Sequence, residues 1–231
     1  SGDGSSGAPY KTFHKAYTSA SDNYIINLTG TFDWNSSGED GDVSERGYIL
    51  DKNLTIQGYG SELAIIQSSS NISNSDRRIF EISATKSVTL KRLILQNGKT
   101  SSDDGGGLEI KGNGNIDQCI IRNNQATSGS GGGIDVIGSL YISNSLVSSN
   151  TAHYMGGGIN RNYNDPNNGN PGASYKLDII NCTIAFNKVT QTVAYLEGGG
   201  VFYRRGQGSI TNSTIVYNRV ENGPGSSTHG I

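Results

Sequence analysis

Two carboxylates occupy equivalent places in a repeated sequence, a pattern that acid–base chemistry could use. Glu109 and Asp135 are each the second residue after a run of three glycines, in Gly-Gly-Gly-Leu-Glu-Ile and Gly-Gly-Gly-Ile-Asp-Val. In parallel strands stacked about 4.8 Å apart, the two groups would be close enough to act as a general acid and a base. Because residues alternate across a strand, we expect both side chains to point outward into solvent, in one stripe with Asn160 and Phe202. A lyase also needs a cation to stabilise a carbanion, and Arg161 is the candidate.

The cysteines and histidines form no further catalytic pattern. Cys119 and Cys182 fall in the same column of the repeat but two coils apart, roughly 9.6 Å, which exceeds the reach of a disulfide. We expect two free, buried thiols. His14, His153 and His229 have no Asp or Glu repeated beside them, so neither a catalytic triad nor a zinc site is indicated. We expect solvated histidines.

Two acidic turns could hold a hard cation. Asp40 and Asp42 lie in one glycine-containing segment, and Asp103 and Asp104 lie in another. Calcium prefers clustered carboxylate and carbonyl oxygens, but neither segment has the spacing of a known calcium loop. We expect no cofactor, and structural calcium at these turns stays open.

Aromatic residues gather around a polar insertion at about residues 160–174, which interrupts the repeat. Insertions in solenoids collect on one face, often the binding face. Aromatic rings can stack on sugars, with amides as hydrogen-bonding partners. The candidate ligand-binding residues are Tyr154, Tyr163, Asn164, Asp165, Tyr175, Tyr195 and Phe202. A loop that simply packs on the solenoid, with the tyrosines as spacers, is the alternative.

The element that must position these residues is a repeat of about 25 residues. Three glycines followed by an aliphatic residue occur four times, ending at Gly107, Gly133, Gly158 and Gly200, at intervals of 26, 25 and 42 residues. The long interval is one repeat plus an insertion. The repeat shows no helical apolar period, which favours coils of short strands stacked in parallel.

Three columns of like residues support this stacking, because equivalent side chains of successive coils lie directly over one another. The first aliphatic column is Leu90, Ile116, Ile142, Ile179 and Ile210. The second is Leu95, Ile121, Val147, Ile184 and Ile215. The polar column is Asn124, Asn150, Asn187 and Asn218, for which we expect a hydrogen-bonded ladder. The fold class is therefore an all-β parallel β-solenoid.

Composition agrees with this fold and limits the partners. The chain has 231 residues, 33 glycines, 4 prolines and a net charge of −2. This charge argues against binding nucleic acid, and no apolar run is long enough for membrane insertion. We expect one domain over 1–231, with an N-terminal cap and first coils in 1–58 and repeat coils in 59–231.

The start of the chain, with Tyr24-Ile-Ile-Asn-Leu and Asn53-Leu-Thr-Ile-Gln-Gly, resembles right-handed parallel β-helix proteins, in which a short helix, here 11–20, caps the first coil. The repeats over 90–231 resemble those of polymorphic outer-membrane proteins, the chlamydial autotransporter adhesins, which pair Gly-Gly-x-Ile with Phe-x-x-Asn. The first element matches four times. The second matches loosely, because its first position is not Phe, as in Ile184-Ala-Phe-Asn, where that position is Ile184. The resemblance implies a right-handed β-helix of a secreted or surface-displayed bacterial adhesin and transfers no catalytic residue.

The sequence thus supports three functions. We favour a non-catalytic adhesin or glycan-binding module, secreted or on the cell surface, that binds a glycan or a ligand on a host or neighbouring cell. A polysaccharide lyase or glycoside hydrolase of the parallel β-helix type is the alternative, and a structural stalk without ligand is the third. Because Ile231 follows Gly230 where a new coil should begin, we expect the rest of a longer chain as a further partner.

Overall fold

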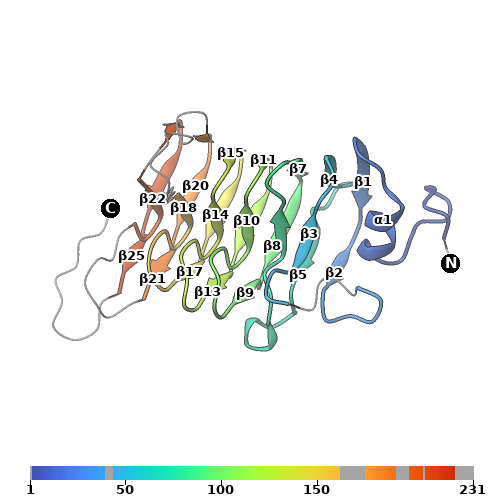
Figure 1. The fold of residues 1–231 in the computed structure, drawn as a ribbon, viewed down its shortest axis with the longest axis horizontal. Helices are drawn as coiled ribbons and strands as arrows, with labels where there is room; N and C mark the ends of the chain where they lie inside the picture. Colours follow the sequence, from blue (N-terminus) through green and yellow to red (C-terminus); the bar gives the residue numbers. More distant parts are fainter. Residues whose placement is uncertain (1, 40–43, 162–174, 191–197, 205, 222–231) are drawn as a thin grey trace.

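The structure, a computed structural model, describes residues 2–39, 44–161, 175–190, 198–204 and 206–221. Its strands form sheets whose neighbouring members come from successive coils, so the chain is an all-β parallel solenoid, as the repeats predicted. The coils stack in one row, from α1 (Phe13–Ser19) at one end to β22 (Val201–Tyr203) at the other (Figure 1).

Successive coils add one strand at a time to four parallel sheets. The first sheet contains β1 (Tyr24–Leu28), β4 (Leu54–Gly58), β7 (Ser87–Lys91), β11 (Asn113–Asp117), β15 (Ser139–Ser143), β19 (Lys176–Ile180) and β23 (Gln207–Thr211). The second contains β2 (Thr31–Asp33), β5 (Ala64–Gln67), β8 (Leu93–Gln96), β12 (Ile120–Arg122), β16 (Leu146–Ser148), β20 (Thr183–Ala185) and β24 (Thr214–Val216). The short third sheet contains β9 (Lys99–Thr100), β13 (Gln125–Ala126), β17 (Thr151–Ala152), β21 (Lys188–Val189) and β25 (Arg219–Val220). The fourth contains β3 (Tyr48–Leu50), β6 (Phe80–Ile82), β10 (Leu108–Ile110), β14 (Ile134–Val136), β18 (Ile159–Arg161) and β22.

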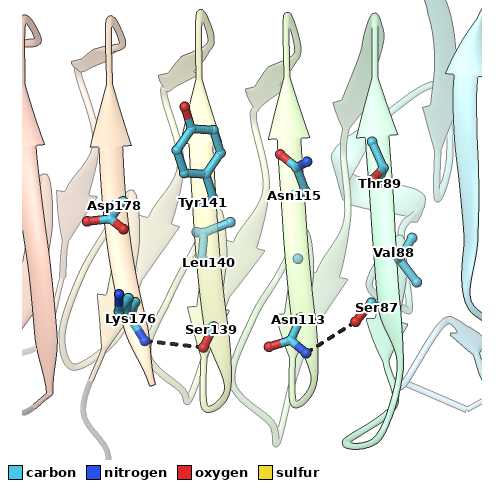
Figure 2. Close-up of a pocket in the computed structure, with 11 residues that line it drawn as sticks. Ser87, Val88, Thr89, Asn113, Asn115, Ser139, Leu140, Tyr141, Lys176 and Asp178 are labelled. Carbon is cyan, nitrogen blue, oxygen red and sulfur yellow. Dashed lines mark hydrogen bonds between the residues drawn. The ribbon is translucent and has the colours of Figure 1, made fainter. Parts of the chain in front are cut away.

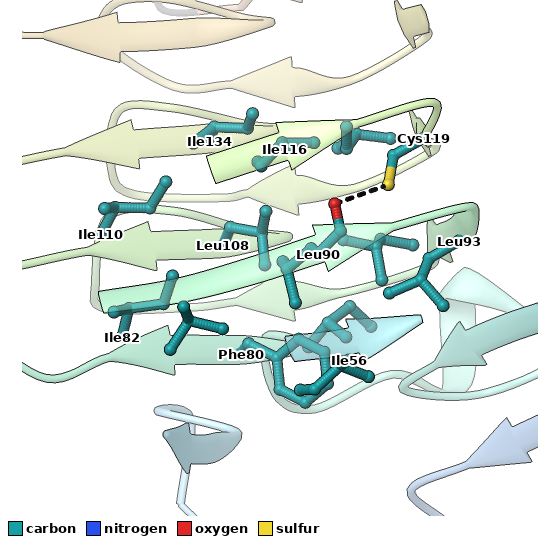
Figure 3. Close-up of a cluster of buried hydrophobic side chains, with 14 of the residues drawn as sticks. Ile56, Phe80, Ile82, Leu90, Leu93, Leu108, Ile110, Ile116, Cys119 and Ile134 are labelled. Carbon is teal, nitrogen blue, oxygen red and sulfur yellow. Dashed lines mark hydrogen bonds between the residues drawn. The ribbon is translucent and has the colours of Figure 1, made fainter. Parts of the chain in front are cut away.

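The strand register confirms both aliphatic columns. Ile116 pairs with Leu90 in the coil before it and with Ile142 in the coil after it. Ile121 pairs in the same way with Leu95 and Val147. All six side chains are fully buried, and Figure 3 shows Leu90 and Ile116 within the apolar cluster that fills the inside of the coils. The core is therefore a stack of equivalent residues rather than a single layer.

The two cysteines belong to this core as free thiols, as predicted. Sγ of Cys119 donates a weak hydrogen bond to the Leu90 carbonyl oxygen at 3.4 Å (Figure 3). The backbone N–H groups of Cys119 and Cys182 donate to the hydroxyls of Ser145 and Ser213, one coil further on. Burial raises the pKa of the Cys119 thiol to about 12, so this group stays protonated and packs as a small apolar side chain.

The asparagine column forms the predicted ladder. Nδ2 of Asn124 donates to Oδ1 of Asn150 at 3.0 Å, and Nδ2 of Asn150 donates to Oδ1 of Asn187 at 2.9 Å. Each accepting oxygen also receives the backbone N–H of the asparagine one coil earlier. Asn218 continues the series. Buried polar groups at this corner are thus satisfied by the next coil, which fixes the register of one coil on another.

The glycine triples have two different reasons for lacking a side chain. The first glycine adopts a positive φ, 66° at Gly105 and 65° at Gly131, which is the left-handed region. The second lies against the backbone of a neighbouring corner, where a Cβ on Gly132 would be 2.4 Å from the carbonyl carbon of Thr151. Any larger residue there would push the corners of the coils apart.

The N-terminal helix is shorter than the expected 11–20 and begins after its N-cap, Thr12, whose side chain accepts the N–H of Lys15. The carboxylate of Glu39 accepts the backbone N–H groups of Phe13 and His14 at 2.8 and 3.0 Å, which places a negative charge at the helix start. No helix in the described ranges is long and apolar enough to cross a membrane.

An aromatic cluster joins this helix to the first coils. The ring of Phe13 lies 4.9 Å from that of Tyr48 and 5.4 Å from that of Trp34, centroid to centroid. Nδ1 of His14 is 3.0 Å from the Tyr48 hydroxyl and the residue is half-buried, so the histidine expected to be solvated is only partly so. The helix therefore covers the N-terminal end of the core with large rings, as a cap should.

The described part of the last coil has no equivalent cover. Ile210 and Ile215 continue the two aliphatic columns, but they are 53% and 39% exposed. Their neighbours one coil earlier, Ile179 and Ile184, are fully buried. The expectation about Ile231 concerns a residue outside the described ranges.

Candidate functional site

The predicted acid–base pair is aligned but not exposed. Glu109 on β10 and Asp135 on β14 are direct partners in the parallel register, as expected. Each is only 4% exposed, and Asn160 and Phe202 in the same row are also buried. The prediction of a solvated stripe was therefore wrong, since other parts of the chain cover the outer face of the fourth sheet.

Arg78 provides much of that cover. Its side chain is completely buried, and its guanidinium contacts the carboxylates of Glu109, Glu81 (3.2 Å) and Asp103 (2.6 Å). Nζ of Lys111 lies 3.1 Å from both Glu81 and Glu109. Glu109 thus belongs to a buried ion network, in which burial raises its pKa although Arg78 and Lys111 act in the opposite direction.

The sequence does contain a signal for Arg78. Phe80 pairs with Leu108, so Arg78 stands where the next coil has Gly106, the second glycine of its triple. The coil before the first glycine triple therefore has a long cation at a position that later coils leave empty. The sequence analysis missed Arg78 because it compared only the positions that are alike in all repeats.

Burial also changes the protonation of Asp135, in the same row as Glu109. Asp135 accepts a 2.6 Å hydrogen bond from Nδ2 of Asn160. Burial, followed by the negative charges of Asp104 and Glu109, raises the pKa of Asp135 to about 8. Glu81 differs: although burial acts in the opposite direction, the Arg46 and Lys111 side chains lower its pKa to about 2.

Arg161 does not join the carboxylates as the lyase hypothesis required. Its side chain is fully buried, and Nη1 donates to the backbone carbonyls of Val136 (2.9 Å) and Ile137 (2.5 Å). A polymeric substrate cannot reach a buried pair of carboxylates, and this cation is directed to the backbone. The described geometry gives the catalytic hypothesis no accessible site at Glu109, Asp135 and Arg161.

The two calcium candidates within the described residues, Asp103 and Asp104, have partners in the protein. Asp103 pairs with Arg78, and Oδ1 of Asp104 accepts the backbone N–H of Ser130 at 2.6 Å. Within the described ranges, no three His, Cys, Asp or Glu side chains are grouped so as to hold a metal ion. Asp40 and Asp42 lie outside those ranges, so calcium there stays a prediction.

The predicted aromatic site is only partly described, and its described members differ in exposure. Tyr154 is exposed on the corner before β18, Tyr175 is half-buried just before β19, and Phe202 is buried in β22. His153, half-buried, packs edge-on against Tyr154. The other members and the third histidine lie outside the described residues: Tyr163, Asn164, Asp165, Tyr195 and His229.

The structure instead shows a groove of about 440 Å³ on the outer face of the first sheet, across β7, β11, β15 and β19 (Figure 2). Its side chains form two rows because residues alternate along each strand. One row is Ser87, Asn113, Ser139 and Lys176, and the other is Thr89, Asn115, Tyr141 and Asp178. We call this surface the outer groove.

Hydrogen bonds hold the outer groove's first row in place. Nδ2 of Asn113 donates to the Ser87 hydroxyl at 3.2 Å, and the Ser139 hydroxyl accepts the backbone N–H of Lys176, also at 3.2 Å (Figure 2). In the second row, the Tyr141 ring is 44% exposed. It stands between Asn115 and Asp178 of the neighbouring coils (Figure 2).

The row beside the groove carries compensated charges. Lys91 and Asp117 form an ion pair at 3.3 Å, and Asp117 also accepts hydrogen bonds from Ser143 (3.0 Å) and Asn144 (2.8 Å). These partners lower the pKa of Asp117 although burial opposes them. The face therefore offers hydroxyls, amides and one ring, with little net charge.

Sequence reasoning overlooked this groove although the repeat contained it. The second row of the groove stands one residue before the first aliphatic column, so the alignment already placed its members in one outward row: Thr89, Asn115, Tyr141 and Asp178.

Comparisons with protein-family models, curated proteins and solved structures find no match to this chain.

Proposed function

We propose that this protein is a non-catalytic glycan-binding β-solenoid whose binding surface is the outer groove. The observation that carries the proposal is the exposed Tyr141 ring between Asn115 and Asp178, in a groove built on rigid strands. A ring flanked by hydrogen-bonding groups suits a sugar, which has apolar C–H faces and hydroxyls at its edge.

The geometry favours a neutral, extended chain lying along the solenoid axis. The binding rows repeat once per coil, at about 4.8 Å, so consecutive sugars meet side chains at equivalent positions of successive coils. Lys176 and Asp178 place opposite charges at one end of the groove. Such a face offers no electrostatic preference for a strongly charged polymer.

We extend the proposal to a secreted or surface-displayed bacterial adhesin. The repeated Gly-Gly-Gly-aliphatic element, similar to that of the polymorphic outer-membrane proteins, supports this assignment, as does the stack of coils with one continuous outer face. The ligand would be a glycan on a host or neighbouring cell.

The test is calorimetric titration with neutral cello-, xylo- and manno-oligosaccharides. Tyr141→Ala should weaken binding at least tenfold, about 1.4 kcal/mol, because it removes the stacking surface. Tyr59→Ala is the matched control, since Tyr59 is 64% exposed and lies outside the groove. No binding by the unaltered protein, or equal binding by Tyr141→Ala, would overturn the proposal.

The same samples distinguish binding from hydrolysis. The reducing ends released from each oligosaccharide are measured with the unaltered protein and with Glu109→Gln. Release of ends that Glu109→Gln abolishes would replace our proposal with the enzyme alternative, and an unchanged substrate supports binding alone.

A further inference from the structure

A second surface lies at the corner between the second and third sheets. One residue of each coil, directly after β8, β12, β16, β20 and β24, adopts the left-handed conformation there. The column is Asn97, Asn123, Ser149, Phe186 and Tyr217, with φ between 54° and 58°. Asparagine tolerates this conformation, whereas bulky aromatic residues rarely adopt it. Backbone strain of this kind concentrates at functional positions.

The two aromatic members of the column face solvent as a stacked pair. The rings of Phe186 and Tyr217 lie 5.2 Å apart, centroid to centroid, with an interplanar angle of 15°. They are 54% and 70% exposed. Rings in this arrangement contribute little to the core, so packing does not explain why the column changes from small polar residues to aromatic ones.

A groove begins where the ring pair ends. It has a volume of about 320 Å³ and is lined on one side by Ser149, Asn123 and Asn97, the earlier members of the same column. Gln125 and Thr151 of the third sheet line the other side. Because Ser149 lacks a ring, a planar ligand there would extend the aromatic stack by one coil. We call the ring pair and this space the corner groove.

The edge of the corner groove is cationic. The outward row of the third sheet is Lys99, Gln125, Thr151, Lys188 and Arg219 in consecutive coils. Glu221 offsets part of this charge, with its carboxylate 3.5 Å from Nζ of Lys188 and 2.5 Å from Nε of Arg219. Three cations against one carboxylate leave a positive strip on a chain whose net charge is −2.

We propose that the corner groove is a second binding site, selective for acidic polysaccharides that contain uronic acids. A sugar face stacks on Phe186, whose other face packs on Tyr217, and the hydroxyls meet Ser149, Asn123 and Thr151. The carboxylates of the ligand lie toward Lys188 and Arg219. The site shares no residue with the outer groove, so it stands or falls separately from the first proposal.

The test uses oligogalacturonates and the same oligomers after their carboxyl groups have been reduced to alcohols. The double variant Phe186→Ser, Tyr217→Asn places in the column the residue types that earlier coils already use, so it should fold and melt at or above the original temperature. We expect it to lose at least tenfold in affinity for oligogalacturonate. Tyr141→Ala, in the outer groove, should not.

Charge provides the second arm. Lys188→Gln should weaken oligogalacturonate binding and reduce its salt dependence, and the carboxyl-reduced oligomer should bind at least tenfold more weakly to the unaltered protein. Equal affinity of the folded double variant, or equal affinity for the two oligomers, would overturn the inference. If Tyr141→Ala alone abolished binding of both neutral and acidic oligomers, one site would serve both and the corner groove would be rejected.

Discussion

Nδ2 of Asn160 lies 2.6 Å from Oδ1 of Asp135, across two adjacent coils and out of contact with solvent. The raised pKa of Asp135, about 8 against an ordinary 3.8, means that the folded protein holds a proton that the unfolded chain releases. Between these two values, stability should therefore fall as the pH rises, by up to about 1.4 kcal/mol per pH unit.

Asp135→Asn should reduce this pH dependence, because an amide has no proton to lose, and leave the part that comes from Asp104 and Glu109, whose pKa values burial also raises. Urea unfolding at pH 5, 6.5 and 8 measures the effect. Measurements above pH 4.5 exclude the titration of Glu81. Its lowered pKa makes the free energy of unfolding change with pH in the opposite direction, because stability is lost as the pH falls toward 2. Equal slopes for the variant and the unaltered protein would show that Asp135 is ionised in the fold.

Loss of Arg78 should be strongly destabilising. It leaves Glu81 and Glu109 buried with Lys111 but without the buried Arg78 guanidinium, and breaking a buried ion pair in this way typically costs about 3–5 kcal/mol. We expect Arg78→Met to unfold at lower denaturant concentration, and Arg78→Met with Glu109→Gln to recover part of the loss. A double variant no more stable than Arg78→Met would contradict the proposed coupling.

Core truncations should follow burial. Ile121→Ala, Ile142→Ala and Ile184→Ala each remove a fully buried member of the stack and should cost about 2–5 kcal/mol. Ile120→Ala, on the outer side of β12, and Ile210→Ala, half-exposed in the last described coil, should cost less. Chemical denaturation ranks the five variants, and equal tolerance at all positions would refute the assigned phase.

The asparagine ladder should be sensitive at its centre. Asn150→Ala removes the acceptor of both the backbone N–H and Nδ2 of Asn124, and the donor to the Ile121 carbonyl. Each buried group left without a partner costs about 1–3 kcal/mol. Asn115→Ala, in the exposed outer groove, is the control and should change the free energy of unfolding little.

Hydrogen exchange should differ along the row of coils. Backbone amides of 207–221 should exchange faster than those of 108–161, because the aliphatic columns lose their cover at Ile210 and Ile215. Mass spectrometry of a dilute, monomeric sample makes the comparison. Uniform protection of both ranges would show that the described last coil is as stable as the middle of the solenoid.

The features that repeat could be predicted from the sequence, and those that occur once could not. Both aliphatic columns and the Asn150 ladder follow from the 25-residue period, since stacking makes sequence alignment equivalent to contact. The burial of Glu109 depends on Arg78 and Asp103, which have no counterpart in the later coils. The outward position of Tyr141 could have been predicted, because it stands in a repeated column. The binding site was instead predicted around the insertion at 160–174.

The ladder bond from Asn124 to Asn150 joins residues 26 apart in sequence, and the bond from Asn150 to Asn187 joins residues 37 apart, yet their lengths are 3.0 and 2.9 Å. Contact between coils is therefore independent of how much chain lies between them. The additional residues lie between β18 and β19, away from the ladder, so connections of quite different length can join these strands without changing how the coils stack. Such a molecule can diversify the loops it displays, by evolution or by design, while its frame stays constant.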